Sequence, residues 1–296
     1  MALIENLQDI KAIKEEIKTS IENKGVDTTN STFADYPELI DSIETGGGEV
    51  DFAITNCRDL FIGGERTEEL STFYKIVKPI DGYRMFGASS NTTCATSQEE
   101  LNYINKIDFS ECTSLANGFG RVSYSNFPSE LILDLPNCLS VDSIFYGYAL
   151  CYNTKKVVFK NSNKVTDWDY CFYGGLNSNL DNRNKKIEEI ELDMSACTNC
   201  TNFFNMTSHT YSGCMYLSKI TFTGSFGGDS NTNTLTLDLS KLEAMTKDSF
   251  VSMFESLGTN TNGKTRIIQI STTIYDTMTE DELAIATSKG YTITSA

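Results

Sequence analysis

Four aspartates occupy the same place in short hydrophobic strings of this 296-residue chain. Because side chains alternate along a β-strand, each aspartate would point outward between two buried neighbours. Carboxylates stacked at the spacing of adjacent strands, about 4.8 Å, suit a hard cation such as calcium or the hydroxyl groups of a sugar. Asp108 and Asp134 are therefore candidate surface-binding residues. The four strings are Ile107-Asp108-Phe109-Ser110, Leu133-Asp134-Leu135-Pro136, Leu192-Asp193-Met194-Ser195 and Leu237-Asp238-Leu239-Ser240.

A simpler role for these aspartates is to turn the chain. Each one lies two residues before a serine or a proline, and aspartate in this setting helps a chain leave a strand. Calcium takes six to eight oxygen ligands, and no loop supplies them at a recognisable spacing. We favour the turn interpretation, and we expect neither a metal nor a cofactor.

Cys197 and Cys200 have the spacing of half a zinc site. No second pair follows at a usual distance, so Cys214 and the only histidine would have to complete the site. Cys197 also lies four residues after its aspartate, as Cys112 and Cys138 do. A shared repeat position favours buried, hydrophobic cysteines over zinc ligands.

Catalytic constellations are hard to build from this sequence. His209 is the only histidine, and its serine and threonine neighbours indicate a loop, so no serine–histidine or cysteine–histidine pair is expected. Acidic residues are abundant enough for a glycosidase pair, but no two of them stand out. We predict that the protein is not an enzyme.

Aromatic side chains are the remaining candidates for ligand contact. Tyr146, Tyr148 and Tyr173 lie in runs of aromatic residues and could stack on sugar rings. The phenylalanines at repeated positions are expected in the core. Trp168 fits either role.

Fixed offsets identify a repeated structural unit. An aromatic residue follows the first three aspartates by eleven positions, as Phe119, Phe145 and Phe204. The predicted outward positions recur about every 27 residues with uneven steps. Polar insertions at 177–185 and 227–233 therefore protrude as loops, or the solenoid is irregular there. The outward positions are Asp108, Asp134, Val158, Asp193, Thr221, Asp238 and Gln269.

The N-terminal part is expected to be helical. Apolar residues recur every three or four positions over residues 2–24, and a second short helix is predicted over 33–43. A seam rich in isoleucine favours trimers or larger assemblies over dimers. Three glycines at 46–48 form a flexible joint. The seam residues are Leu3, Leu7, Ile10, Ile13, Ile17 and Ile21.

The C-terminal segment is expected to be a cap. Thr279 and Glu282 form a capping box, Gly290 stops the helix, and residues 291–294 are predicted to form a last strand. The predicted fold class is thus α+β, with an N-terminal helical anchor, an irregular leucine-rich-repeat solenoid and a C-terminal capping helix and strand. The expected divisions are 1–45 (oligomerisation or anchor module), 46–100 (glycine linker and N-terminal cap of the solenoid), 101–270 (solenoid) and 271–296 (C-terminal cap).

The net charge limits which partners we expect for this chain. The net charge is −16, which disfavours nucleic acid and anionic membranes. The sequence contains no secretory signal and no apolar run of membrane-spanning length, so we expect folding in a reducing cytoplasm.

Residues 101–270 resemble the BspA-like leucine-rich repeats, through the pattern Cys-x-x-Leu-x-x-Ile-x-Phe at Cys214–Phe222 and the recurring aspartate strings. The stretch Lys24-Gly25-Val26, with Phe33-Ala34-Asp35-Tyr36-Pro37, is similar to the start of many tailed-phage virion proteins. The ending at 283–293 is similar to the close of repeat proteins from phages of gut bacteria.

These resemblances imply a bacteriophage virion structural protein of the head-fibre, tail-fibre or head-decoration type, assembled in the host bacterial cytoplasm. They imply a homo-oligomer, with a trimer favoured, that contacts capsid or tail proteins and serves in host attachment through a surface glycan or protein. A secreted bacterial surface adhesin and a polysaccharide depolymerase remain the alternatives.

Overall fold

The computed structural model describes residues 54–57, 77–86, 104–119, 128–145, 154–172, 187–204, 216–227, 234–261 and 263–296, with scattered residues between 14 and 32. The chain divides into two compact units, Met1–Phe52 and Ala53–Ala296. The finer division into four segments stays a prediction.

In the first unit, the described residues of the predicted 2–24 helix are helical, from Lys14 to Glu22 with gaps. Ile21 is buried within the chain, whereas Ile17 is half-buried. The other four seam residues lie outside the described residues, and so does the whole of the second predicted helix, Phe33–Ile43.

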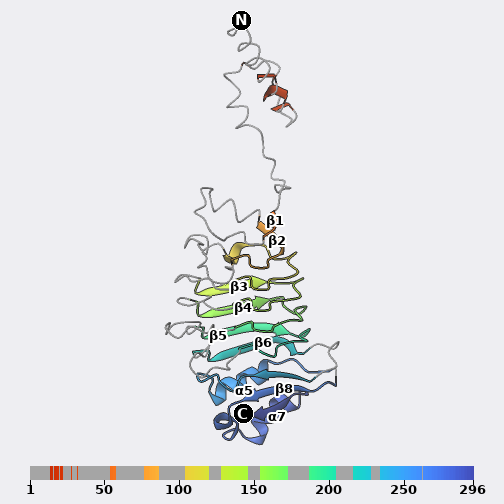
Figure 1. The fold of residues 1–296 in the computed structure, drawn as a ribbon. Coiled ribbons are helices and arrows are strands. Elements are labelled where there is room, and N and C mark those ends of the chain that lie inside the picture. Colours follow the sequence, from red (N-terminus) through yellow and green to blue (C-terminus); the bar gives the residue numbers. More distant parts are fainter. Residues whose placement is uncertain are drawn as a thin grey trace. The chain divides into compact units, whose positions relative to one another are not determined.

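The second unit is a mixed helix and strand structure with a parallel, β-solenoid-like arrangement of strands (Figure 1). In the described residues, three parallel sheets follow along the chain, in the orders β1-β2, β3-β4-β5-β6 and β7-β8-β9. The strands are β1 (Ile54–Asn56), β2 (Val77–Asp81), β3 (Glu130–Asp134), β4 (Lys156–Lys160), β5 (Glu189–Met194), β6 (Lys219–Phe226), β7 (Leu235–Asp238), β8 (Arg266–Ile270) and β9 (Thr292–Ser295). The helical elements are η2 (Ile104–Lys106), α5 (Lys247–Ser256), α6 (Thr272–Tyr275) and α7 (Glu280–Thr287).

Successive strands of the four-stranded sheet stack their apolar residues in register. Leu131 pairs with Val157, which pairs with Ile190, and Ile190 pairs with Ile220. All four are buried, and their neighbours in sequence point outward. The alternation predicted from the sequence is therefore confirmed in these strands.

A second parallel ladder runs along the solenoid. Single bridges join Asp81, Ser114, Ser140, Asp167 and Asn199 in turn. Five residues after each bridge residue, a phenylalanine enters the core, and the rings stack from coil to coil with centroid separations of 4.9, 5.7, 5.3 and 5.6 Å. This phenylalanine column, which includes the predicted core residues Phe119, Phe145 and Phe204, consists of Phe86, Phe119, Phe145, Phe172 and Phe204.

The capping box, the helix and the last strand predicted for the C-terminal segment are present. The Thr279 N–H donates to Glu282 Oε2 (2.8 Å) and the Glu282 N–H donates to Thr279 Oγ1 (3.2 Å), which completes the capping box. The last strand is β9. Lys289 Nζ donates to the carbonyl oxygens of Phe254, Glu255 and Leu257 at 2.7–2.9 Å, so it caps the C-terminus of α5.

Three details of the predicted register are wrong. Asp193 is predicted between Val158 and Thr221, but Glu191 is the residue that pairs with both. Asp134 pairs with Lys160 rather than with Val158, whose partner is Ile132. Asp238 does not follow Thr221 in one sheet, because β7 starts a separate sheet with β8 and β9. The error at Asp238 falls at the step from Thr221 to Asp238, which is much shorter than the average spacing of the predicted outward positions.

We expect Phe145→Ala to lower the free energy of unfolding by about 3–5 kcal/mol, because it removes a ring that packs against both Phe119 and Phe172. The control is Ile132→Ala on the exposed side of β3, which we expect to change stability by about 0.5 kcal/mol or less. Urea denaturation of both variants measures the difference, and equal effects would contradict the packing role of the column.

Candidate functional site

The candidate site is the outer face of the four-stranded sheet, named here the strand face, which consists of the outward side chains of β3, β4, β5 and β6. The first outward position of each strand carries a charge. In register these residues are Glu130, Lys156, Glu189 and Lys219, so the sign alternates from strand to strand. We call these four residues the charged column.

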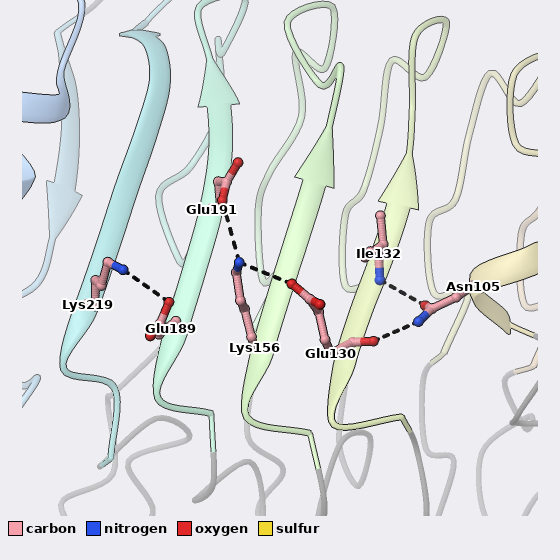
Figure 2. Close-up of polar contacts among 7 residues, drawn as sticks. All are labelled: Asn105, Glu130, Ile132, Lys156, Glu189, Glu191 and Lys219. Carbon is pink, nitrogen blue, oxygen red and sulfur yellow. Dashed lines mark hydrogen bonds and ion pairs between the residues drawn. The ribbon is translucent and has the colours of Figure 1, made fainter.

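The charges of this column are linked across the strands (Figure 2). Lys156 Nζ lies 3.1 Å from Glu130 Oε1 and 3.8 Å from Glu191 Oε2, while Lys219 Nζ lies 3.2 Å from Glu189 Oε2. The hydrogen bond to Glu130 is the main cause that raises the pKa of Lys156 above its ordinary value. The column is thus held in place by cross-strand ion pairs, while its side chains keep between 33% and 54% of their exposure.

Asn105 covers the outer edge of β3. Its Oδ1 accepts a hydrogen bond from the Ile132 N–H (2.9 Å), and its Nδ2 donates to the Glu130 carbonyl (2.7 Å), as Figure 2 shows. The side-chain amide therefore takes the place of a neighbouring strand's peptide groups. Asp108, predicted on a strand here, follows the 3-10 turn η2 instead, although Ile107 and Phe109 point inward as expected.

The second outward position of each strand is less often charged. Ile132 and Val158 lie next to each other in register and are partly exposed, and their column continues through Glu191 and Thr221. This places apolar surface beside the charged column.

Three of the four aspartates of the repeated strings serve as turn residues. Oδ1 of Asp108, Asp193 and Asp238 each accepts the N–H of the serine two residues later, at 2.9 Å. Hydrogen bonding from the side chain of that serine, followed by this backbone bond, lowers the pKa of Asp108. Proline follows Asp134 at that offset and has no N–H, so Asp134 accepts from Asn161 Nδ2 (2.7 Å) and lies 3.4 Å from Lys160 Nζ. These contacts support the turn interpretation over a stacked acidic pair.

The cysteines of the described residues belong to the core. Cys112, Cys138, Cys197 and Cys200 are buried and free. Burial raises the pKa of the Cys57 thiol to about 12 and that of Cys197 well above its ordinary value. Protonated, buried thiols are poor nucleophiles and poor metal ligands. Within the described residues, no three metal-ligating side chains come together.

Other predicted candidates divide between the core and the undescribed segments. Trp168 is buried, and its indole N–H donates to the Val165 carbonyl (3.0 Å), so it is a core residue rather than a stacking platform. Tyr146, Tyr148, Tyr173 and His209 lie outside the described residues.

The charged column and Asn105 are the features that sequence reasoning missed. A signal for the column was present, because each of its four residues directly precedes the first buried aliphatic residue of a strand. No such signal marks Asn105, whose role depends on the gap left beside β3.

The chain matches no family model, and neither a curated protein nor a solved structure is significantly similar to it. No helix in the described parts of the chain is long and apolar enough to cross a bilayer.

A half-buried carboxylate lies two residues after the bridge residue Ser140. Burial raises the pKa of Asp142, and the nearby charges of Asp167 and Asp169 raise it further. Ser143 Oγ donates to its Oδ1 (2.9 Å), which opposes the shift.

We expect Lys156→Gln to lower stability by about 0.5–1 kcal/mol, since it leaves Glu130 and Glu191 without their shared cation. Lys219→Gln removes one ion pair and should cost about half as much. Thermal unfolding in low and high salt measures both effects. Loss of the difference between the variants at low salt would contradict the bridging role of Lys156.

We expect Asp142→Asn to raise the midpoint of thermal unfolding at pH 7 by about 1–2 °C. A raised folded-state pKa means that this carboxyl reduces stability as the pH rises from the ordinary aspartate range through the folded-state pKa. The gain should vanish near pH 3, where both states are protonated. Asp108→Asn is the control with opposite sign, because its pKa is lowered: it should destabilise at pH 7 and lose its effect in acid.

Proposed function

We propose that this protein is a non-enzymatic display protein, in which a helical N-terminal segment assembles or anchors the chain and the solenoid presents the strand face to a partner. The observation that carries the proposal is the strand face itself. Its charged side chains are fixed by cross-strand ion pairs, which limits the entropy lost when they meet a partner.

The chemistry of the described residues favours binding over catalysis. The described aspartates of the repeated strings are engaged in turns or ion pairs, and the described cysteines are buried. Charged groups beside apolar side chains suit recognition of a protein surface or of a glycan.

The virion context comes from the sequence. The resemblance to BspA-like repeats and to tailed-phage proteins supports a head or tail fibre, or a head-decoration protein, whose partners are capsid or tail proteins and a host-surface glycan or protein. The isoleucine-rich seam supports a homotrimer. Of its two described residues, Ile17 retains exposure for contact with other copies, whereas Ile21 is already covered by its own chain.

We expect removal of residues 1–45 to abolish assembly and leave the solenoid folded, because the second unit has its own continuous core. Multi-angle light scattering reports the mass, and circular dichroism with thermal unfolding reports the fold. A truncated protein that keeps the mass of the full-length assembly would contradict this division of roles.

A point variant refines this test. Ile17→Asp places a charge on the seam and should reduce the mass of the assembly, whereas Thr19→Asp adds the same charge at an exposed position and should leave it unchanged.

A further inference from the structure

We propose that the strand face binds the strand face of a second copy of this chain, with the two sheets packed face to face and the order of their strands reversed. The inference does not depend on the proposed virion role. It follows from the sequence of charges along the four-residue charged column.

Four alternating charges complement themselves when the column is turned end to end. A two-fold axis parallel to the strands, passing between β4 and β5, keeps the strand direction and reverses the strand order. Glu130 of one copy then faces Lys219 of the other, and Lys156 faces Glu189. Because an isologous contact occurs twice, the four residues give four opposite-charge encounters.

The alternative arrangement is unfavourable. If the two copies kept the same strand order, Glu130 would face Glu130 and Lys156 would face Lys156, and every encounter would be between like charges. The charged column thus selects one orientation of the second copy.

The physical state of the face is compatible with this contact. Packed sheets lie about 10 Å apart, a distance that lysine and glutamate side chains from both sides can span. The side chains of Glu130 and Lys219 are 48% and 54% exposed and sit at the two ends of the column. Ile132 and Val158 add apolar area in the adjacent column.

Charge balance distinguishes the charged column from the chain as a whole. The full chain carries a net charge of −16, so two copies repel each other on average. The charged column is neutral in sum. Because the sheet as described has four short strands, the contact is small, and we expect weak association that is strengthened by low salt.

The test is a charge exchange in the full-length protein, followed by sedimentation velocity over a concentration series at low salt. Glu130→Lys and Lys219→Glu each create two like-charge encounters per pair of copies, and each should weaken self-association about tenfold. The double variant restores opposite charges between copies, and its association should return to within about threefold of the unmodified chain.

The same double variant separates the contact between copies from the ion pairs within one copy. Within one copy, the double variant places a positive charge beside Lys156 and a negative charge beside Glu189. Its midpoint of thermal unfolding should therefore be lower than that of either single variant. Recovered association without recovered stability supports the proposal. The proposal is overturned if the double variant associates no better than the single variants, or if the unmodified chain shows no concentration-dependent association beyond its basal state.

Matched controls guard against general effects of charge. Lys241→Glu, Glu243→Lys and their combination make the same charge changes at exposed positions outside the strand face, and they should leave association unchanged. If a charge reversal prevents folding, Glu130→Gln and Lys219→Gln take its place, each with an expected weakening of about threefold. Unchanged association in these neutral variants overturns the proposal as well.

Discussion

The structure depends on the in-register stacking of parallel coils. Two backbone ladders, one through β3–β6 and one through the bridge residues, place equivalent residues of successive coils one above another. Each inward position therefore becomes a column whose members must fit their neighbours in size. The phenylalanine column shows the consequence, because an aromatic ring meets an aromatic ring at four consecutive steps.

The same stacking constrains the outer face. Outward residues of adjacent strands are also close, so a charge repeated in every coil would repel itself. Alternation of glutamate and lysine satisfies this constraint, and Lys156 contributes most because it lies between two glutamates. The alternating charges that stabilise one chain therefore also give its outer face a pattern that changes when the strand order is reversed.

The sequence predicted the parts of the fold that depend on local chemistry. The aspartate–serine turns and the capping box at Thr279 follow from interactions within a few residues, and the buried phenylalanines follow from a fixed offset in the repeat. The register was harder, because Asp134 lies two positions beyond the residue that pairs with Val158 and its string does not reveal this offset. Three residues after the bridge residue, the backbone of successive coils is left-handed. Asn117, Ser143 and Tyr170 occupy this position instead of glycine, so no glycine marked these turns in the sequence. The strand face escaped prediction for a related reason, since its pairs join residues about 26–33 positions apart.

Side chains form hydrogen bonds with the backbone at both edges of the four-stranded sheet. Asn105 covers β3, while on β6 the Phe222 N–H donates to Ser256 Oγ and the Phe226 N–H donates to Tyr291 Oη, each at 2.9 Å. These hydrogen bonds occupy edge groups that an added strand would use, which leaves the face as the part of this sheet open to a partner. An even number of strands with alternating charges is complementary to its own reverse, whereas a fifth alternating strand would set like charges against each other. The four-strand width of the sheet is thus what makes its charged column complementary to its own reverse.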